Sequence, residues 1–317
     1  GGCSKMGVDG SPTPCHRPRI LVVVGPTAVG KSAAAVELAE RIGGEIVCAD
    51  SRTVYCGMDI GTAKPTPQMR ERVTHHLLDV ADPRELFTVR DFQRMARAAI
   101  DAIRARGRTP VLVGGTGLYV RAVVDGLDIP EVPPDWALRR RWEAEERVNP
   151  GVLYRRLQVL DPVAASRIPP SNVRRVIRAL EVCHHTGRPA SHQWGRAPDP
   201  EAVQVGLTMD RATLYRRIDG RVDEQIRAGL VDEVRALLGA GVDPALPAMQ
   251  GLGYKEIVAH LRGEVGLDDA IRALRRNTRR YAKRQLTWFR ADPRIRWIAV
   301  DGLDASEVAE RVMRAVC

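Results

Sequence analysis

The chain has 317 residues, a length that suits one large domain or two domains of ordinary size. Apolar residues make up 44% of it and charged residues 28%, which is the composition of a folded globular protein and excludes wholesale disorder. Lysine and arginine number 49 against 39 acidic residues, and the resulting formal net charge of +10 favours a polyanionic partner.

The sequence indicates neither a membrane protein nor a disulfide-stabilised one. Its longest apolar strand, residues 20–24, is far shorter than the roughly 18 residues that a membrane span needs. The six cysteines include no C-x-x-C pair, which excludes zinc-ribbon and thioredoxin-like sites, and they resemble no secreted disulfide framework. We therefore expect a cytoplasmic protein, and nothing in the sequence indicates more than a monomer.

Hydrophobic patterns alternate between strands and helices along the first part of the chain. Residues 1–19 are rich in Gly, Pro, Ser and Cys and are predicted to be a disordered leader. Apolar runs predict buried parallel strands at 20–24, 45–49 and 111–113, with intervening helices at 32–42 and 89–106. Strand-like segments return at 203–207 and 295–300. This alternation predicts an α/β fold, a parallel sheet flanked by helices.

The pattern changes after Val124. Residues 125–200 contain arginine-rich helical stretches, interrupted by prolines at 133–134, 150 and 169–170, and no convincing strand. We therefore predict a discontinuous core made of residues 20–124 and 201–317, with an inserted all-helical domain at residues 125–200.

The strongest single motif is GPTAVGKS, which fits the phosphate-binding pattern G-x-x-x-x-G-K-[ST] between a buried strand and a helix. Its residues are Gly25, Pro26, Thr27, Ala28, Val29, Gly30, Lys31 and Ser32. The glycines let backbone N–H groups point inward, and the helix N-terminus adds positive potential. Lys31 is placed to reach phosphate oxygens and Ser32 to ligate Mg²⁺. A kinase, an NTPase and an enzyme of a diphosphate substrate all fit this P-loop.

Two polar residues follow other strands of the predicted sheet. Asp50 ends the strand at 45–49, and Thr116 lies in the GGTG segment after the strand at 111–113. Because ligands bind beyond the carboxyl ends of parallel strands, Lys31, Asp50 and Thr116 are expected in one crevice. Asp50 then has three open roles, as a magnesium ligand, a general base or a helix cap. Thr116 has two, orienting a substrate or capping the next helix.

A basic block lies near the end of the chain. Residues 271–296 contain ten arginines and lysines and one acid, Asp292. A block of one charge sign at this density favours a nucleic acid as the partner over a solvated helix face, which usually carries interleaved acids.

Beyond the P-loop, seven further strings identify a family. They are ADSRTVYCGMDIGTAKP (49–65), HHLLDV (75–80), VLVGGTGLY (111–119), RALEV (178–182), LYRRIDGRVDEQIRAGLVDEV (214–234), GLGYKEI (251–257) and RRYAKRQLTWFR (279–290). Together with GPTAVGKS and in this order, they resemble the bacterial tRNA dimethylallyltransferase (tRNA isopentenyltransferase) family. The resemblance runs from Ile20 to Val300.

This resemblance implies a prenyltransferase. Its members transfer a dimethylallyl group from dimethylallyl diphosphate to N6 of the adenosine adjacent to the anticodon (position 37), in tRNAs that read codons beginning with U, and they release pyrophosphate. The P-loop then holds the diphosphate of the donor with Mg²⁺ as the cofactor, and the helical insertion grips the anticodon stem-loop. A stacked base is out of reach, so the nucleotide must be flipped out.

The resemblance also implies roles for single residues. Asp50 would accept the N6 proton, Thr116 would hydrogen-bond near the reacting centre, and Arg217 would stabilise negative charge on the pyrophosphate. Arg217 is the arginine of the R-I-D string of the family. For its neighbours Arg216 and Arg221, the alternative interpretation is a helix-surface pair with no role in the reaction. The implied tRNA contacts are Asp50, Ser51, Arg52, Thr53, Thr116, Arg139, Arg174, Arg175, Val176, Ile177, Arg178, Gln250, Gly251, Leu252, Gly253, Tyr254, Lys255, Lys283, Arg284, Gln285, Leu286, Thr287, Trp288, Phe289 and Arg290. Two of these residues are aromatic. Phe289 is predicted to lie in the core, while Trp288 remains open between a place in the core and stacking on a nucleotide.

One position departs from the family pattern. Members commonly have glutamine in D-S-x-Q-x-Y where this chain has Thr53, so the contact of this position with the target base is in doubt. The chain also lacks the C-terminal zinc module of eukaryotic members, which favours the bacterial type. A nucleotide or small-molecule kinase, a non-enzymatic RNA-binding protein and an adenylate-specific prenyltransferase are the alternatives. The kinase does not explain the basic block or the GGTGLY segment, and a non-enzymatic RNA-binding protein has no need of Asp50. The long basic insertion argues against the adenylate-specific enzyme.

Overall fold

A computed structural model describes residues 20–316, and the predicted leader at residues 1–19 lies outside the described residues. The chain divides into two compact units. One combines the chain up to Val120 with the chain from Pro200 onward, and the other is Arg121–Asp199. Nowhere in the described range does a helix have the length and apolar character that crossing a membrane requires.

A parallel sheet forms the centre of the first unit, in the order β3-β2-β4-β1-β5-β6. The strands are β1 (Ile20–Val24), β2 (Gly44–Cys48), β3 (His75–His76), β4 (Thr109–Gly114), β5 (Ala202–Thr208) and β6 (Arg296–Ala299). The predicted parallel α/β sheet is therefore confirmed. Only β3 escaped prediction, because a two-residue strand leaves no periodic pattern.

The strand register aligns the carboxyl ends of the central strands. Val24 of β1 lies level with Gly114 of β4 and Gly206 of β5, and Cys48 of β2 lies level with Val113. The segments that follow β1, β2 and β4 therefore emerge at one edge of the sheet, where ligands of parallel sheets bind.

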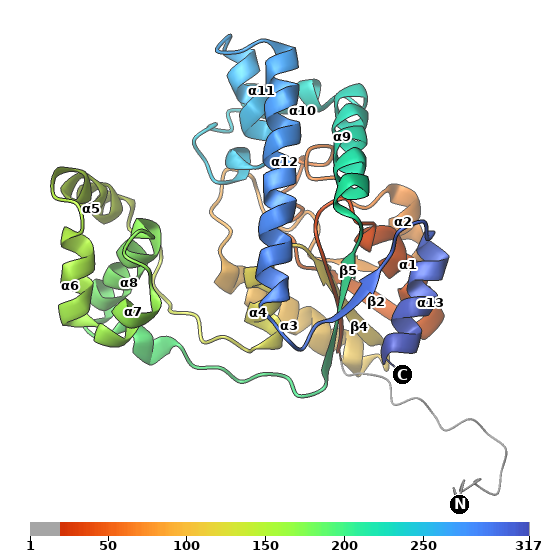
Figure 1. Cartoon of the computed structure of the whole chain (residues 1–317), viewed down its shortest axis with the longest axis horizontal. Helices are drawn as coiled ribbons and strands as arrows, with labels where there is room; N and C mark the ends of the chain where they lie inside the picture. The colour runs from red at the N-terminus through yellow and green to blue at the C-terminus, as the bar shows by residue number, and fades with distance from the viewer. Residues whose placement is uncertain (1–19, 317) are drawn as a thin grey trace, which may run out of the picture. The chain divides into compact units, whose positions relative to one another are not determined.

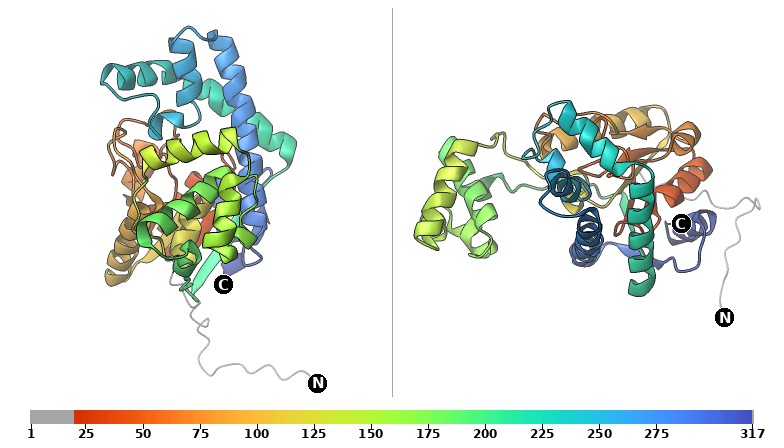
Figure 2. Two further views of the ribbon diagram at one scale, coloured as in Figure 1. Left: turned by 90° about the vertical axis from the view of Figure 1, so that its left-hand side faces the viewer. Right: turned by 90° about the horizontal axis from the view of Figure 1, so that it is seen from above.

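Helices cover both faces of this sheet. Those of the first unit are α1 (Lys31–Ile42), α2 (Pro67–Arg72), α3 (Val89–Ala105), α9 (Arg211–Arg227), α10 (Leu230–Gly239), α11 (Tyr254–Leu261), α12 (Leu267–Arg290) and α13 (Ala305–Val316), while α4 (Gly117–Val124) crosses the boundary between the units. α1 packs beside α13 on one face, and α3 lies against the other (Figure 2). Beyond the carboxyl edge, α9 and α12 pack side by side (Figure 1).

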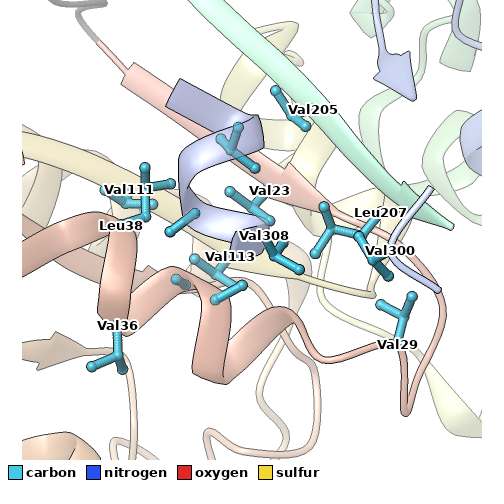
Figure 3. Packing of buried hydrophobic residues seen from close by; sticks show 14 of the residues in the cluster. Val23, Val29, Val36, Leu38, Val111, Val113, Val205, Leu207, Val300 and Val308 are labelled. Atoms are coloured by element: carbon cyan, nitrogen blue, oxygen red, sulfur yellow. The ribbon is translucent and has the colours of Figure 1, made fainter. Parts of the chain in front are cut away.

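A core of aliphatic side chains fixes α1 and α13 on the sheet. Val23, Val113 and Val205 come from three neighbouring strands, and Leu38 and Val308 come from the two helices (Figure 3). All five are buried. Each such side chain contributes about 1.5–3 kcal/mol on burial, so this packing holds the start of α1, and with it the P-loop, in place.

The second unit is all-helical apart from one isolated bridge between Leu127 and Arg196. Its helices after α4 are α5 (Trp136–Val148), α6 (Val152–Leu160), α7 (Pro162–Arg167) and α8 (Val173–Thr186). Short polar side chains begin several of them, because Asp135, Asp161 and Asn172 each accept a hydrogen bond from a backbone amide of the first turn. Trp142 and Leu157 lie in the core that these helices enclose.

Candidate active site

The P-loop turns tightly between β1 and α1. Ala28 and Gly30 both have positive φ angles, of 66° and 103°. These left-handed residues curl the backbone around the N-terminus of α1, which begins at Lys31. The Lys31 side chain folds back over the loop, where its Nζ donates a hydrogen bond of 2.6 Å to the carbonyl of Pro26.

A cavity of about 460 Å³ opens beside this loop. It joins the P-loop to the residues that follow β2 and β4 and to helices α9 and α12. Its lining includes Thr27, Ala28, Gly30, Lys31, Ser32, Cys48, Asp50, Thr53, Thr62, Ala63, Lys64, Pro65, Thr66, Met69, His75, Gly114, Gly115, Arg221, Glu224, Tyr281 and Gln285. The structure thus brings Lys31 and Asp50 to one cavity, as the strand topology predicts.

The charge of Lys31 depends on what the cavity holds. Burial lowers the pKa of its ammonium group to about 7, and the nearby positive charge of Arg221 acts in the same direction, while Asp50 opposes the shift. A phosphate group in the cavity would favour the charged ammonium. Lys31 is therefore poised to gain a proton when an anion binds.

Asp50 lies in a tight turn at the end of β2. Its Oδ1 accepts a hydrogen bond of 2.8 Å from the backbone amide of Arg52. The backbone amide of Ser51, between these two residues, donates to Thr116 Oγ1 at 3.0 Å. The GGTG segment therefore stabilises the same turn. Thr116 does not belong to the cavity lining, and its hydroxyl fixes the backbone beside Asp50. Its two predicted roles, orienting a substrate and capping the next helix, stay predictions.

Gln285 of α12 joins two of the segments that form the cavity. Its Oε1 accepts a hydrogen bond of 2.8 Å from the amide of Thr27, and its Nε2 donates one of 2.9 Å to the carbonyl of Gly115. A Cβ atom at Gly115 would lie only 2.2 Å from Gln285 Nε2, which explains the glycine at this position. Gln285 thus has a bracing role between the P-loop and the GGTG segment that the sequence analysis did not foresee.

Two arginines of α9 reach the P-loop. Arg221 Nη1 donates to Thr27 Oγ1 at 2.9 Å, and Arg221 lines the cavity. Arg217, the residue chosen from the sequence, is exposed and reaches the carbonyl of Val29 at 3.5 Å. Burial lowers the pKa of Arg221, and Glu224 and Asp50 oppose that shift. Arg221 therefore points into the site, where the sequence left it open as part of a surface pair.

Thr53 and Tyr281 add two hydroxyl groups to the cavity lining. Thr53 Oγ1 is buried and has no hydrogen-bond partner among the described residues 20–316. Burial raises the pKa of Tyr281 to about 12, and a hydrogen bond with Thr116 acts against the shift. Tyr281 therefore stays a neutral hydrogen-bonding group, and Thr53 offers an unused hydroxyl to a ligand.

The sequence matches the family model described as IPP transferase over residues 53–292, which is more than half of the chain. The chain belongs to the IPP transferase family. It is 52% identical to a tRNA dimethylallyltransferase of Thermomicrobium roseum over 286 residues, covering 90% of this chain and 87% of that protein. A tRNA dimethylallyltransferase of Desulforudis audaxviator is 54% identical over 288 residues, with 90% and 93% covered.

Solved structures of the IPP transferase family share the fold. The full-length tRNA isopentenylpyrophosphate transferase of Bacillus halodurans is 42% identical, with a TM-score of 0.70 and coverage of 95% of this chain and 97% of that one. A eukaryotic dimethylallyltransferase acting on tRNA is 27% identical, with a TM-score of 0.76 and coverage of 94% and 77%. The resemblance inferred from the sequence is therefore confirmed.

The residues predicted from the family to contact tRNA differ in exposure. Those with exposed side chains are Arg174, Arg175, Gln250, Lys255, Lys283, Arg284, Thr287, Trp288 and Arg290. Val176 and Ile177 instead lie in the core of the helical unit, and Tyr254 and Phe289 are buried in the first unit. These four side chains hold the helices that present their exposed neighbours. Contacts of the exposed side chains with tRNA stay predictions.

The basic block is partly neutralised across two helices. Arg279 pairs with Asp219 and Arg275 with Asp223, both carboxylates coming from α9. Within the part of the chain that the structure describes, no carboxylate pairs with Lys283 or Arg284. Among the described residues, the exposed Arg276 and Arg280 also have no carboxylate partner. The available positive charge of α12 therefore extends from Arg276 to the last two turns, near the cavity-lining Gln285.

In the helical unit, Arg139 and Arg178 share a buried carboxylate. Both donate to Glu181, which has no exposed surface, with Arg139 Nε at 2.8 Å from Oε1 and Arg178 Nη1 at 2.5 Å from Oε2. Burial works against the charged carboxylate, but these hydrogen bonds hold the pKa of Glu181 below its ordinary value. Arg139 thus fixes α5 to α8, while Arg178, on α8 itself, also donates to the carbonyl of Val132 at 2.8 Å and ties α8 to the segment before α5. These are roles in addition to any contact with tRNA.

The predicted Mg²⁺ site rests on Ser32, which lies exposed at the start of α1 and lines the cavity. Among residues 20–316, no three His, Cys, Asp or Glu side chains gather as a metal cage. Mg²⁺ commonly takes one or two protein ligands and completes its shell with water and substrate phosphate oxygens. A hydroxyl beside the P-loop therefore fits Mg²⁺ carried by a diphosphate.

Proposed function

We propose that this chain transfers a dimethylallyl group from dimethylallyl diphosphate to N6 of the adenosine adjacent to the anticodon of tRNA (position 37), in tRNAs that read codons beginning with U. The observation that carries the proposal is the shared cavity, which places a P-loop and the Asp50 carboxylate in one space. Family membership supplies the class of reaction, since relatives at 52% and 54% identity are named tRNA dimethylallyltransferases.

The P-loop end of the cavity suits the diphosphate. Backbone amides of the loop, the Lys31 ammonium and the Arg221 guanidinium converge there. As the bond between the first dimethylallyl carbon and the diphosphate oxygen breaks, negative charge grows on the leaving pyrophosphate. Fixed positive groups stabilise that charge most in the transition state. Mg²⁺ held through Ser32 and the diphosphate oxygens would neutralise part of it.

Asp50 suits the acceptor end. The lone pair of N6 is conjugated with the adenine ring, so the amine becomes a better nucleophile as its proton is removed. In the proposed step, N6 attacks the first dimethylallyl carbon, pyrophosphate leaves, and Asp50 takes the N6 proton. The hydrogen bonds that Asp50 and Ser51 make with Arg52 and Thr116 hold the carboxylate in position.

The tRNA is the partner that the charge distribution supports. Lys283 and Arg284 are exposed on α12, one turn from the cavity-lining residues Tyr281 and Gln285. The helical unit adds the exposed Arg174 and Arg175, so we propose that it grips the anticodon stem-loop. We further propose that the chain acts as a cytoplasmic monomer.

The decisive experiment is mass spectrometry of unmodified tRNA with an A-rich anticodon loop, incubated with the protein, Mg²⁺ and dimethylallyl diphosphate. We expect one five-carbon adduct on one adenosine, with no requirement for ATP. Phosphorylation of a small acceptor that depends on ATP, without an adduct, would instead indicate a kinase.

The Asp50→Ala variant tests the assigned base in the same assay. We expect the rate of transfer to fall by about 100-fold or more, while the affinity for tRNA changes by no more than a few-fold. A variant that keeps half of the rate would remove Asp50 as the general base.

A further inference from the structure

One stripe of α9 contacts two of the segments that surround the cavity. Arg217, Arg221 and Gln225 follow each other at spacings of four residues and therefore lie on one side of the helix. The two arginines reach the P-loop at Val29 and Thr27. Gln225 Nε2 instead donates to the carbonyls of Ile60 and Gly61, at 2.8 and 3.0 Å. A single rigid helix thus spans the distance between the P-loop and the segment that contains Ile60.

That segment, residues 59–66, forms a wall of the cavity and is called the wall loop below. Thr62, Ala63, Lys64, Pro65 and Thr66 of the wall loop all line the cavity. It lies in none of the helices or strands of the described chain, so side-chain contacts from elsewhere must fix its position.

Glu233 of α10 supplies the main anchor. Its Oε2 accepts from the backbone amides of Asp59 and Ile60 at 2.9 and 2.8 Å, and its Oε1 accepts from the amide of Gly61 at 3.1 Å. Tyr254 donates its hydroxyl to the same Oε1 at 2.6 Å. One carboxylate therefore satisfies three consecutive amides, an arrangement that requires the ionised, acceptor-only form of the side chain.

Close packing restricts the same segment further. A Cβ atom at Gly61 would lie 2.5 Å from the ring of Tyr254, so only glycine lets the loop approach the ring this closely. At the other end of the wall loop, the buried Lys64 donates to the carbonyl of Tyr55 at 2.6 Å and pairs with Asp59 at 2.6 Å and with Asp79. The wall loop is consequently held at both ends.

We propose that Gln225 and Glu233 are positioning residues that fix the wall loop at a set distance from the P-loop and thereby shape the cavity for the diphosphate donor. Neither side chain lines the cavity. They act through the backbone of residues 59–61, while Arg221, on the same helix stripe, holds the P-loop at Thr27. This inference rests on the proposed function, because it assigns the P-loop end of the cavity to the donor.

Hydrogen exchange tests the anchor without any assay of activity. In Glu233→Gln, an amide NH2 group, which can only donate, replaces one of the two carboxylate oxygens. At least one of the four hydrogen bonds that these oxygens accept is therefore lost. We expect the peptide containing residues 58–66 to exchange about tenfold faster or more, since its amides lose their acceptor. Asp232→Asn is the matched control, because this exposed neighbour on α10 pairs, within residues 20–316, only with Arg235 of its own helix. Unchanged exchange in Glu233→Gln would overturn the anchor.

Steady-state kinetics tests the consequence for the donor. For Gln225→Ala and Glu233→Gln we expect the KM for dimethylallyl diphosphate to rise about tenfold, with the KM for tRNA within twofold and the melting temperature close to that of the wild type. Asp232→Asn should match the wild type. An equal rise in both KM values would indicate general damage and overturn the positioning role. Inactive wild-type protein would refute the proposed function instead. Titration with inorganic pyrophosphate would then test whether the variants bind this ligand more weakly than the wild type does.

Discussion

The guanidinium of Arg221 donates a hydrogen bond of 2.9 Å to the hydroxyl of Thr27, across 194 residues of sequence. The contact links α9 to the P-loop and places a positive charge inside the cavity beside Lys31. Arg217 sits one helical turn earlier, exposed, with a longer contact to Val29. Of the two arginines, Arg221 is thus the better placed to stabilise a pyrophosphate leaving group.

We expect Arg221→Ala to lower kcat/KM for dimethylallyl diphosphate by about 100-fold, the effect of removing one preorganised donor from a developing negative charge. Arg217→Ala should cost less, about tenfold, because its guanidinium is more exposed to solvent. Arg216→Ala is the control, since Arg216 is exposed and its guanidinium donates to the hydroxyl of Thr213 within the same helix. Normal turnover in Arg221→Ala would place this arginine outside the reacting site.

The lowered pKa of Lys31 predicts how donor binding depends on pH. In the free protein Lys31 loses its proton as the pH rises through about 7, whereas a bound diphosphate favours the ammonium. Above pH 7 binding must therefore take up a proton, and the contribution of Lys31 to affinity falls by up to about tenfold per pH unit. Below pH 7 both states are protonated and this dependence disappears.

Isothermal titration with inorganic pyrophosphate from pH 6 to pH 9 measures this effect. Pyrophosphate itself titrates in the range, so wild type and Lys31→Met are compared in the same buffers and the ligand contribution cancels. We expect the advantage of the wild type over Lys31→Met to shrink as the pH rises above 7. A constant advantage across the range would show that Lys31 stays charged in the free protein.

The sequence allowed Lys31 and Asp50 to be placed together because both follow buried strands of one parallel sheet. The carboxyl ends of such strands meet at one edge, so topology alone predicts their proximity. Arg221 and Glu233 could not be placed in this way. Each lies on a helix, where the facing partner depends on how that helix packs against its neighbouring helices. The spacing of residues 217, 221 and 225 was the available signal, and it showed only that these side chains share a face.

Motif matches also left the direction of individual side chains open. Val176, Ile177 and Tyr254 lie within strings predicted to contact tRNA, yet all three are buried. A string marks a segment that approaches a ligand, and the side chains within it alternate between the core and the surface. Trp288 shows the mixed case, since it is 41% exposed while its ring packs where a Cβ of Gly117 would lie.

The buried Glu181 predicts the stability of the helical unit. Removing this carboxylate leaves the Arg139 and Arg178 side chains, 16% and 35% exposed, without their shared partner. Because water reaches both guanidinium groups, we expect Glu181→Ala to destabilise the unit by about 1–3 kcal/mol, the cost of lost hydrogen bonds to a charged group. Hydrogen exchange of residues 135–190 measures the loss, and Glu143→Ala, on the exposed face of α5, is the control. Equal protection in both variants would contradict a structural role for the pair.

The ion pairs of Glu181 with Arg139 and Arg178 also predict that the helical unit loses stability at low pH. The folded-state pKa of Glu181 lies below its ordinary value of 4.5, so its stabilising contribution is fully present above pH 4.5. It is lost as the pH falls through the lower folded-state pKa. We therefore expect the helical unit of the wild type to lose exchange protection below pH 4.5, and Glu181→Gln to show a weaker pH dependence in that window.

Lys283 and Arg284 predict how tRNA binding responds to salt. Both are exposed in the last turns of α12, whereas Arg275 and Arg279, earlier on the same helix, are paired with carboxylates of α9. A basic side chain that has no carboxylate partner can contact RNA and release counterions without first breaking an ion pair within the protein. We expect the double variant Lys283→Ala, Arg284→Ala to weaken tRNA binding and to reduce the slope of log Kd against log salt by about 1.4, while a variant of Arg272, paired with Asp269 on its own helix, changes it less. Filter binding between 50 and 300 mM salt measures both slopes, and a double variant with the wild-type slope would remove the end of α12 from the tRNA interface.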